Sequence, residues 1–252
     1  MSVNHVVGNN KIFFIKKSAK ILSYIVLLIL SFFLKINRKN SELIISTAFY
    51  APWKDNKDFT SIYNKVKKLT LLDHARAYTL WYLSNDLKNL SGNIFDVGCM
   101  EGGAGFIMSK ANKKGFVYLF DTFEGFLEEG KYHKRKKHFV YEDIQTVKKN
   151  LKQFMLKNTK VFKCKFPLGI SPSIKNKKIK LCHIDVNTHR STKNAFNFVR
   201  NRMVKGGAIV FDDYGVYTAD NIKKYVKLIS KKHKKDFSFI YNYMGQCILI
   251  KK

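Results

Sequence analysis

Short apolar segments that alternate with amphipathic stretches are the feature of this sequence that most constrains its fold. The apolar segments typically end at Gly, Asp or Asn, as buried β-strands do where they lead into loops. The expected strands are residues 93–97, 116–120, 160–166, 180–184, 208–211, 237–241 and 247–250. Between these strands, apolar residues recur at helical spacing over residues 103–110, 141–156, 192–203 and 219–231. This alternation predicts a parallel sheet covered by helices on both faces.

The last two expected strands differ from the others because only a short turn at Met244 and Gly245 separates them. That turn is too short for a crossover helix, so these strands should form an antiparallel hairpin at one sheet edge. The result is an α/β, doubly wound Rossmann-like sheet with five parallel strands in the order 3-2-1-4-5 plus the C-terminal hairpin. One such domain fits residues 41–252, with two lead-in helices over 41–90 and the sheet core over 91–252.

Residues 1–40 form a separate basic and apolar segment, an N-terminal helical extension. Residues 21–34 are predominantly apolar and have lysines on both sides. As a helix this run would be about 21 Å long, which is shorter than the roughly 30 Å of a hydrocarbon layer. Two interpretations are open: a helix that contacts a membrane surface through residues 12–39, or a helix that packs against protein.

Charge and cysteine content indicate which partners and which cellular compartment to expect for the protein. Lys and Arg number 47 against 18 Asp and Glu, which gives a net charge of +29. Such a charge attracts nucleic acid, acidic glycans or anionic lipid, although a lysine-rich surface without any such partner explains it equally well. The basic segment 130–138 is either a lid over the ligand cleft or a solvated loop. The four cysteines include no C-x-x-C pair, so we expect reduced thiols in the cytoplasm, with the protein free or attached to the cytoplasmic face of the membrane.

Glycine is concentrated where the first expected strand ends. In IFDVGCMEGGAGF, Asp96 is followed by Gly98, Gly102, Gly103 and Gly105. Glycines allow the backbone to approach a ligand closely, but Met100 stands where the dinucleotide motif G-x-G-x-x-G has its second glycine. This disfavours a pyrophosphate cofactor and a nicotinamide dehydrogenase, and it favours S-adenosylmethionine. A tight turn without any ligand is the alternative.

The neighbouring strand ends at Asp121, in the segment YLFDTFEGF. An acid at this position can bind the two hydroxyls of a ribose, which supports a nucleoside cofactor. Phe123 is placed to contact the adenine, although an aromatic residue here is also typical of a hydrophobic core.

The fourth and fifth expected strands end at acids too, Asp185 on one and Asp212 with Asp213 on the other. Because these strands are adjacent in the predicted order, we expect the three carboxylates to converge. Without basic partners they would repel one another unless a cation neutralised them. A ligand set made only of oxygens selects a hard ion such as Mg²⁺. The alternative is that these acids cap the helices that follow.

Together these motifs resemble the macrocin/mycinamicin O-methyltransferase family over residues 49–252. The matching segments are D-x-G-x-x-x-G-G, D-T-F-E-G, H-I-D-V-N-x-x-x-S-T-K and K-G-G-A-I-V-F-D-D-Y-G. The resemblance implies a class I S-adenosylmethionine-dependent fold and Mg²⁺-dependent methylation of a sugar hydroxyl on a natural product or glycan. It also implies two sets of site residues: metal ligands Asp185, Asp212 and Asp213, and cofactor-site residues Asp96, Gly98, Gly102, Gly103, Asp121, Thr122 and Phe123.

The chain departs from the family pattern at the position of the general base. Many members carry a second acid two residues after the first metal ligand, and here that residue is Asn187. An amide does not accept a proton at neutral pH, whereas a free imidazole does. His189 is therefore the first candidate for the base, acting beside Asp185. His183 is the second, since it lies on the same strand face as Asp185 but deeper in the expected core.

We therefore expect an S-adenosylmethionine-dependent O-methyltransferase acting on a sugar or glycan hydroxyl, which is acidic or lipid-linked if the basic charge serves the substrate. The alternatives are a methyltransferase of nucleic acid or of small molecules, and a non-catalytic basic protein of the membrane surface. Nucleic acid is the less favoured substrate because no N/D-P-P-Y/F element follows the fourth strand. The sequence leaves open whether the chain forms a homo-oligomer.

Overall fold

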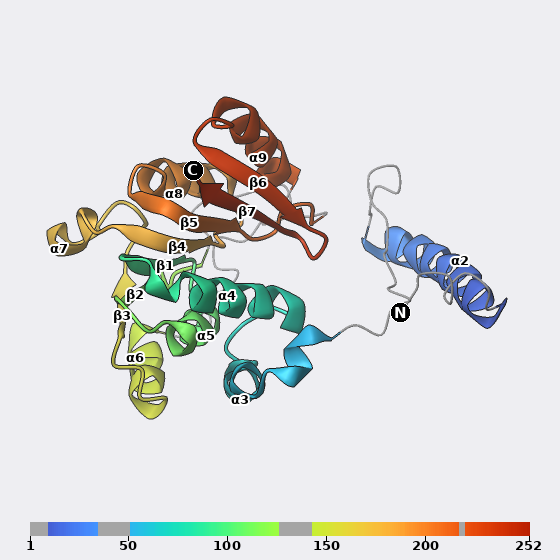
Figure 1. Ribbon diagram of the computed structural model, residues 1–252, viewed down its shortest axis with the longest axis horizontal. Helices are drawn as coiled ribbons and strands as arrows, with labels where there is room; N and C mark the ends of the chain where they lie inside the picture. The colour runs from blue at the N-terminus through green and yellow to red at the C-terminus, as the bar shows by residue number, and fades with distance from the viewer. Residues whose placement is uncertain (1–9, 35–50, 126–142, 217–219) are drawn as a thin grey trace. The chain divides into compact units, whose positions relative to one another are not determined.

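The computed structural model describes residues 10–34, 51–125, 143–216 and 220–252. The chain divides into two compact units, Met1–Pro52 and Trp53–Lys252. In the first unit, helix α2 (Asn10–Leu34) is the element that is described (Figure 1). Among the described helices, none combines the length and the apolar character that crossing a bilayer requires. The basic segment 130–138 lies outside the described residues, and so does the predicted domain boundary at residue 40.

The second unit begins with the two helices that the sequence predicts before the sheet. A short 3-10 turn, η1 (Pro52–Asp55), precedes α3 (Lys57–Val66), and α4 (His74–Asp86) runs into η2 (Leu87–Asn89). Asn56 caps α3 by accepting a hydrogen bond from the Phe59 amide at 2.9 Å. Asp73 caps α4 through the amides of Ala75 and Arg76. Such caps satisfy donors that a helix leaves free at its first turn.

A seven-stranded sheet in the order β3-β2-β1-β4-β5-β7-β6 forms the centre of this unit (Figure 1). Its strands are β1 (Asn93–Val97), β2 (Val117–Asp121), β3 (Thr159–Lys163), β4 (Ile179–Ile184), β5 (Met203–Phe211), β6 (Phe237–Asn242) and β7 (Gln246–Lys251). Strands β1 to β5 pair in parallel, while β7 pairs antiparallel with both β5 and β6. The predicted fold class, with its strand order and terminal hairpin, is confirmed.

Helices cover both faces of the sheet. Neighbouring residues of each strand point to opposite faces, so the strands contribute side chains to two hydrophobic cores. In β1, Ile94 packs into a core with α3, α4 and α5 (Gly103–Ala111), while Phe95 packs into a core with α8 (His189–Val199) and α9 (Asp220–Lys232). The remaining helices are α6 (Ile144–Gln153) and the single turn α7 (Pro172–Lys175).

Helix α8 begins earlier than its apolar pattern predicts. The expected segment starts at residue 192, whereas the helix starts at His189. Thr188 sets this start, since its hydroxyl accepts from the Ser191 amide at 3.4 Å and its carbonyl accepts from the Thr192 hydroxyl at 2.8 Å. The helix therefore begins directly beside the end of β4, which brings the segment between them to the edge of the sheet.

The parallel strands end level with one another. Val97 of β1 pairs with Phe120 of β2 and with Ile184 of β4, and Ile184 pairs in turn with Phe211 of β5. The residues that follow these positions therefore share one edge of the sheet. That edge is where doubly wound folds bind their ligands.

Candidate active site

A cavity of about 350 Å³ opens at the carboxyl ends of the parallel strands. Its wall is built from residues at and after the ends of β1 to β5, together with α4 and the loop before it. The lining residues that the argument uses are Gly98, Met100, Asp121, Thr122, His183, Asp185, Asn187, Asp212, Asp213 and Arg76. The cavity therefore contains both the predicted cofactor site, at the ends of β1 and β2, and the predicted metal site, at the ends of β4 and β5.

Asp121 provides the acid of the cofactor side. Its two carboxylate oxygens accept hydrogen bonds from the backbone amides of Met100, at 2.8 Å, and Phe123, at 2.9 Å. Both donors adopt positive φ angles, 51° and 53°. Burial raises the pKa of Asp121, although these amides oppose the shift. Each oxygen keeps a further lone pair, so the carboxylate can accept the hydroxyls of a ribose from the cavity.

The glycines at the end of β1 serve the packing of the chain itself. Gly98 has φ +90°, and a Cβ there would overlap the carbonyl oxygen of Asp185. At Gly103 a Cβ would lie 2.6 Å from the carbonyl oxygen of Leu69. Gly98 thus allows the end of β1 to approach the segment after β4, and Gly103 allows the start of α5 to approach the loop before α4. Of the two, only Gly98 lines the cavity.

Some of the predicted cofactor-site residues line the cavity and others do not. Gly98, Asp121 and Thr122 line the cavity, whereas Asp96, Gly102, Gly103 and Phe123 are not among its lining residues. Phe123 packs against the core beside α5, and Asp96 is fully buried in β1.

The three predicted metal ligands all line the cavity. Backbone hydrogen bonds position two of them. The Asp185 amide donates to the Val97 carbonyl at 2.9 Å, and the Asp212 amide donates to the Ile184 carbonyl at 3.0 Å. Burial and repulsion from the other two acids raise the pKa of Asp185 well above its usual range. Burial, followed by repulsion from Asp212, raises the pKa of Asp213 to about 6. Such shifts are expected where carboxylates converge away from water.

His183 lies beneath these acids with 1% of its side chain exposed. Its Nδ1 is 2.8 Å from Asp96 Oδ1, and its Nε2 is 3.9 Å from Asp212 Oδ1. The second distance is too long for a hydrogen bond, so Nε2 is a buried polar atom without a hydrogen-bond partner among the described residues. Burial alone would lower the pKa of His183, but the two carboxylates outweigh it and raise the pKa to about 10.

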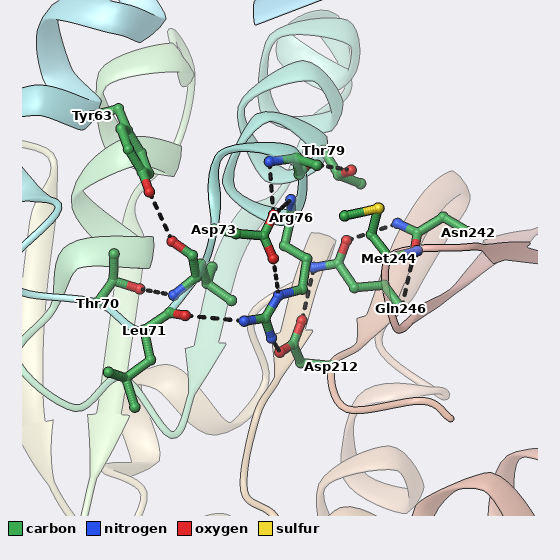
Figure 2. Close-up of polar contacts among 12 residues, drawn as sticks. Tyr63, Thr70, Leu71, Asp73, Arg76, Thr79, Asp212, Asn242, Met244 and Gln246 are labelled. Carbon is green, nitrogen blue, oxygen red and sulfur yellow. Dashed lines mark hydrogen bonds and ion pairs between the residues drawn. The ribbon is translucent and has the colours of Figure 1, made fainter. Parts of the chain in front are cut away.

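Arg76 of α4 is a site residue that the sequence analysis missed. Its Nη1 lies 2.5 Å from Asp212 Oδ2, while its Nε donates to Asp73 Oδ2 at 2.9 Å and its Nη2 donates to the Leu71 carbonyl at 3.0 Å (Figure 2). The expectation that the acids lack basic partners was therefore wrong. The sequence offers one hint: arginine is rare in this lysine-rich chain, and its planar guanidinium suits a fixed carboxylate partner.

Gln246 holds the other oxygen of the same carboxylate. Its Nε2 donates to Asp212 Oδ1 at 2.8 Å, and its Oε1 accepts from Asn242 Nδ2 at 2.8 Å (Figure 2). Although burial opposes it, the combined effect of His183, Arg76 and Gln246 lowers the pKa of Asp212. Asp212 is thus fixed between α4 and the β6–β7 hairpin, and no sequence pattern predicts this contact.

The structure does not bring His189 to the cavity. It is the exposed first residue of α8, and its ring packs edge-on against Tyr225 with 5.2 Å between the centroids. Asn187, where the family pattern has an acid, does line the cavity, with a positive φ of 54°. His189, the predicted base, is therefore not part of the cavity wall, whereas the side-chain amide of Asn187 belongs to a residue that is.

The donor set at the cavity fits a divalent cation. One ligand atom each from His183, Asp185 and Asp212 lies within 4.8 Å of the other two. A cation about 2.1 Å from each ligand bridges atoms up to about 4.2 Å apart, so small side-chain movements would complete the set. The unpartnered Nε2 of His183 points to the same place. Asp213 lines the cavity but is not part of this group.

The sequence profile of the macrocin-O-methyltransferase (TylF) family matches residues 71–237, from the loop before α4 to the start of β6. The chain belongs to this family. It is accordingly an O-methyltransferase that uses S-adenosylmethionine, which agrees with an acid at the tip of β2 in the cavity wall. The predicted family and enzyme class are confirmed. No curated protein sequence matches the chain.

Solved structures of methyltransferases share the fold of this TylF-family chain. The O-methyltransferase NovP is similar with a TM-score of 0.63 and 16% identity, covering 73% of this chain and 82% of NovP. The calicheamicin methyltransferase CalS11 has a TM-score of 0.59 and 12% identity, with 81% and 94% of the two chains covered. A putative caffeoyl-CoA O-methyltransferase from Staphylococcus aureus has a TM-score of 0.55 and 14% identity, with 79% and 94% covered. At these identities the likeness concerns the fold.

Proposed function

We propose that this enzyme transfers the methyl group of S-adenosylmethionine to a hydroxyl group of a sugar or glycan, assisted by a divalent cation. The observation that carries the proposal is the shared cavity: Asp121 lines one side, and Asp185 with Asp212 lines the other. A cofactor bound at Asp121 and an acceptor bound at the acids would then meet in one space. The sugar acceptor is the one that the resemblance to the macrocin O-methyltransferase family implies, and the match to that family's model supports it.

Each side of the cavity has a distinct part in this proposal. Asp121 binds the ribose hydroxyls, and Gly98 and Thr122 border the same ligand. Asp185, Asp212 and Asp213 are the predicted ligands of Mg²⁺, which when bound supplies Lewis-acid activation of the acceptor hydroxyl. Arg76 and Gln246 hold the Asp212 carboxylate at both oxygens, so its orientation is fixed before any ligand arrives. Fixed orientation lowers the entropic cost of aligning the reactants.

The proton of the acceptor hydroxyl needs a base, and the cavity offers a different one from the predicted His189. Asp213 lines the cavity, and in the metal-free protein burial and Asp212 raise its pKa only to about 6, so its carboxylate is ionised at neutral pH and able to accept a proton. Asn187 cannot take this part. We therefore favour Asp213 as proton acceptor. Its predicted role as a metal ligand, and the role of His189 as base, stay predictions.

The finer predictions about substrate and location belong to the same proposal. A net charge of +29 favours an acidic acceptor such as a phosphorylated or uronic-acid glycan. Large apolar side chains of α2 are exposed, among them Phe14, Ile21, Phe32 and Phe33, which suits contact of residues 12–39 with a membrane surface and a lipid-linked acceptor. The cytoplasmic location and a homo-oligomeric state stay predictions.

Transfer of a labelled methyl group tests the proposal. Purified protein is incubated with [methyl-¹⁴C]S-adenosylmethionine and a panel of neutral, uronic and phosphorylated glycosides, with Mg²⁺ or with a chelator. We expect label in one class of glycoside, loss of transfer in the chelator, and loss of transfer in Asp185→Asn. Transfer that survives the chelator and the substitution would refute the cation-assisted mechanism. Label that enters RNA but no glycoside would refute the sugar acceptor.

A further inference from the structure

His183 is a buried imidazole whose two nitrogens have very different surroundings. Nδ1 is paired with Asp96 Oδ1 at 2.8 Å, whereas Nε2 has no hydrogen-bond partner in the described part of the chain, although the side chain is 1% exposed. His183 lines the same cavity as Asp185 and Asp212, and its Nε2 lies 3.9 Å from Asp212 Oδ1. Buried polar atoms are nearly always satisfied, so an exception of this kind indicates a missing partner.

Asp96 fixes the ring in the orientation that metal-bound histidines adopt. A histidine that binds a metal through one nitrogen usually donates the other N–H to a carboxylate, which sets the tautomer and the ring plane. Asp96 is fully buried and lies in β1 beside β4, where Asp96 and His183 are paired in register. This explains why Asp96, which does not line the cavity, is nevertheless an acid: it orients His183.

The distances place Nε2 within reach of a shared cation. Nε2 is 3.9 Å from Asp212 Oδ1, a separation that a cation about 2.1 Å from each atom would bridge. Asp185 completes a group whose ligand atoms lie within 4.8 Å of one another. Asp212 Oδ1 also accepts from Gln246, and its second lone pair remains for the cation.

The balance of charge around this point favours a cation. Asp185, Asp212 and Asp213 face this point and Asp96 lies behind the ring. Among the described residues, the bases that act on these acids are Arg76 and, in the metal-free protein, the protonated His183 itself. Arg76 is itself shared with Asp73. A dication bound at Nε2 would replace the proton there, which leaves to solvent, and its two charges would offset two of the carboxylates.

We propose that His183 is a nitrogen ligand of the divalent cation together with Asp185 and Asp212, so that the site prefers a transition-metal ion such as Mn²⁺ over Mg²⁺. The inference deepens the proposed function and rests on it. Mg²⁺ favours sites made of oxygen ligands, whereas an imidazole nitrogen adds affinity for first-row transition metals. This ligand set differs from the all-carboxylate set that the sequence predicts, and Asp213 is released from metal binding.

Electron paramagnetic resonance of the full-length protein tests the proposal directly. Metal-free protein is titrated with Mn²⁺, and electron spin-echo modulation of the bound ion is recorded. We expect modulation from a directly coordinated ¹⁴N nucleus in the wild type. If Mn²⁺ binds and its modulation contains no ¹⁴N contribution, His183 is not a ligand and the inference is wrong.

Variants of two histidines provide the matched comparison. In His183→Gln the amide can still donate to Asp96, so the fold should persist, as retained binding of S-adenosylmethionine would verify. We expect this variant to lose the ¹⁴N modulation and to bind Mn²⁺ at least about tenfold more weakly, with a smaller factor for Mg²⁺. The control is His233→Gln, since His233 Nδ1 also faces a carboxylate, Asp236, at 3.4 Å, and lies outside the cavity lining. Equal weakening for both ions in His183→Gln would overturn the preference.

Asp185→Asn separates this inference from the proposed function. If Mn²⁺ binding depends on Asp185 but shows no ¹⁴N modulation, the cation site of the proposed function stands and the histidine ligand is refuted. If Mn²⁺ binding is unaffected by both Asp185→Asn and His183→Gln, the cation site itself is refuted, and this inference is refuted with it.

Discussion

Removal of the Arg76 side chain should destabilise the protein because it leaves the Asp212 carboxylate without its closest charge. Asp212 has 1% of its side chain exposed and Arg76 has 18%. Breaking a buried ion pair by deleting one partner costs about 3–5 kcal/mol. Arg76 is partly solvated, and Gln246 and His183 remain beside Asp212, so we expect a smaller loss, about 2–3 kcal/mol, for Arg76→Met. For a domain of this size that lowers the melting temperature by about 4–12 °C.

The loss should depend on pH in one direction only. The folded-state pKa of Asp212 is lowered, so its ionisation contributes stability above the unfolded-state pKa of about 3.9, and that contribution disappears as pH falls through the folded-state pKa. Arg76→Met removes part of this contribution. The difference in unfolding free energy between wild type and variant should therefore be large at pH 7 and shrink only below the unfolded-state pKa, so that it is clearly smaller at about pH 3.

Urea unfolding followed by circular dichroism at both pH values measures this difference. The control is Arg202→Met, because Arg202 donates to the carbonyls of Lys175 and Phe198 rather than to a carboxylate. Its loss of stability should be the same at both pH values. A difference for Arg76→Met below about 1 kcal/mol at pH 7, the level of an exposed pair, or one that grows toward about pH 3, would refute the reasoning.

Three further predictions concern the cofactor side, the buried histidine and the glycine turn. Asp121→Asn should weaken S-adenosylmethionine binding about 10–100-fold in calorimetry, the cost of charged hydrogen bonds, while Mn²⁺ binding is retained; unchanged cofactor affinity would exclude Asp121 as the ribose ligand. The pKa of His183 is raised to about 10, so the unfolding free energy of metal-free protein should fall as pH rises from about 6.5 to 10. That fall should be smaller in His183→Gln, and equal pH profiles would contradict the assigned pKa shift. Gly98→Ala should lower the unfolding free energy by about 1–3 kcal/mol, since its φ of +90° is strained for alanine and a Cβ would overlap the Asp185 carbonyl; a silent substitution in thermal unfolding would refute that packing argument.

The fold could be predicted from the sequence because its determinants are local. Strands β1 and β4, with the hairpin at Met244 and Gly245, follow from apolar runs that end at turn-forming residues, and the strand order follows from the plan of doubly wound sheets. Level strand ends then place Asp121, Asp185 and Asp212 at one edge without any side-chain detail. Strand β5 begins at Met203, whereas the apolar pattern predicts a start at residue 208. The prediction is late because Gly206 and Gly207 interrupt the apolar pattern of the strand.

The interior of the site could not be predicted in the same way because it depends on contacts between distant residues. Arg76 and Asp212 are 136 residues apart, and Gln246 reaches Asp212 from the terminal hairpin. His183 was expected in the core as a secondary candidate, but its pairing with Asp96 depends on the register of β1 against β4. His189 was favoured from its spacing to Asp185, and the cap at Thr188 instead places it at the start of a helix.

The most direct test of the account is whether the cofactor methyl group and the cation occupy the same cavity. S-adenosylmethionine carrying a ¹³C-labelled methyl group is bound to the protein, and the relaxation of that methyl signal is followed as Mn²⁺ is added. A cavity shared by Asp121 with Asp185 and Asp212 predicts strong paramagnetic broadening in the wild type and little in Asp185→Asn. If both ligands bind and the methyl signal stays sharp in the wild type, the cofactor and the cation lie apart, and cation-assisted methyl transfer at this site is contradicted.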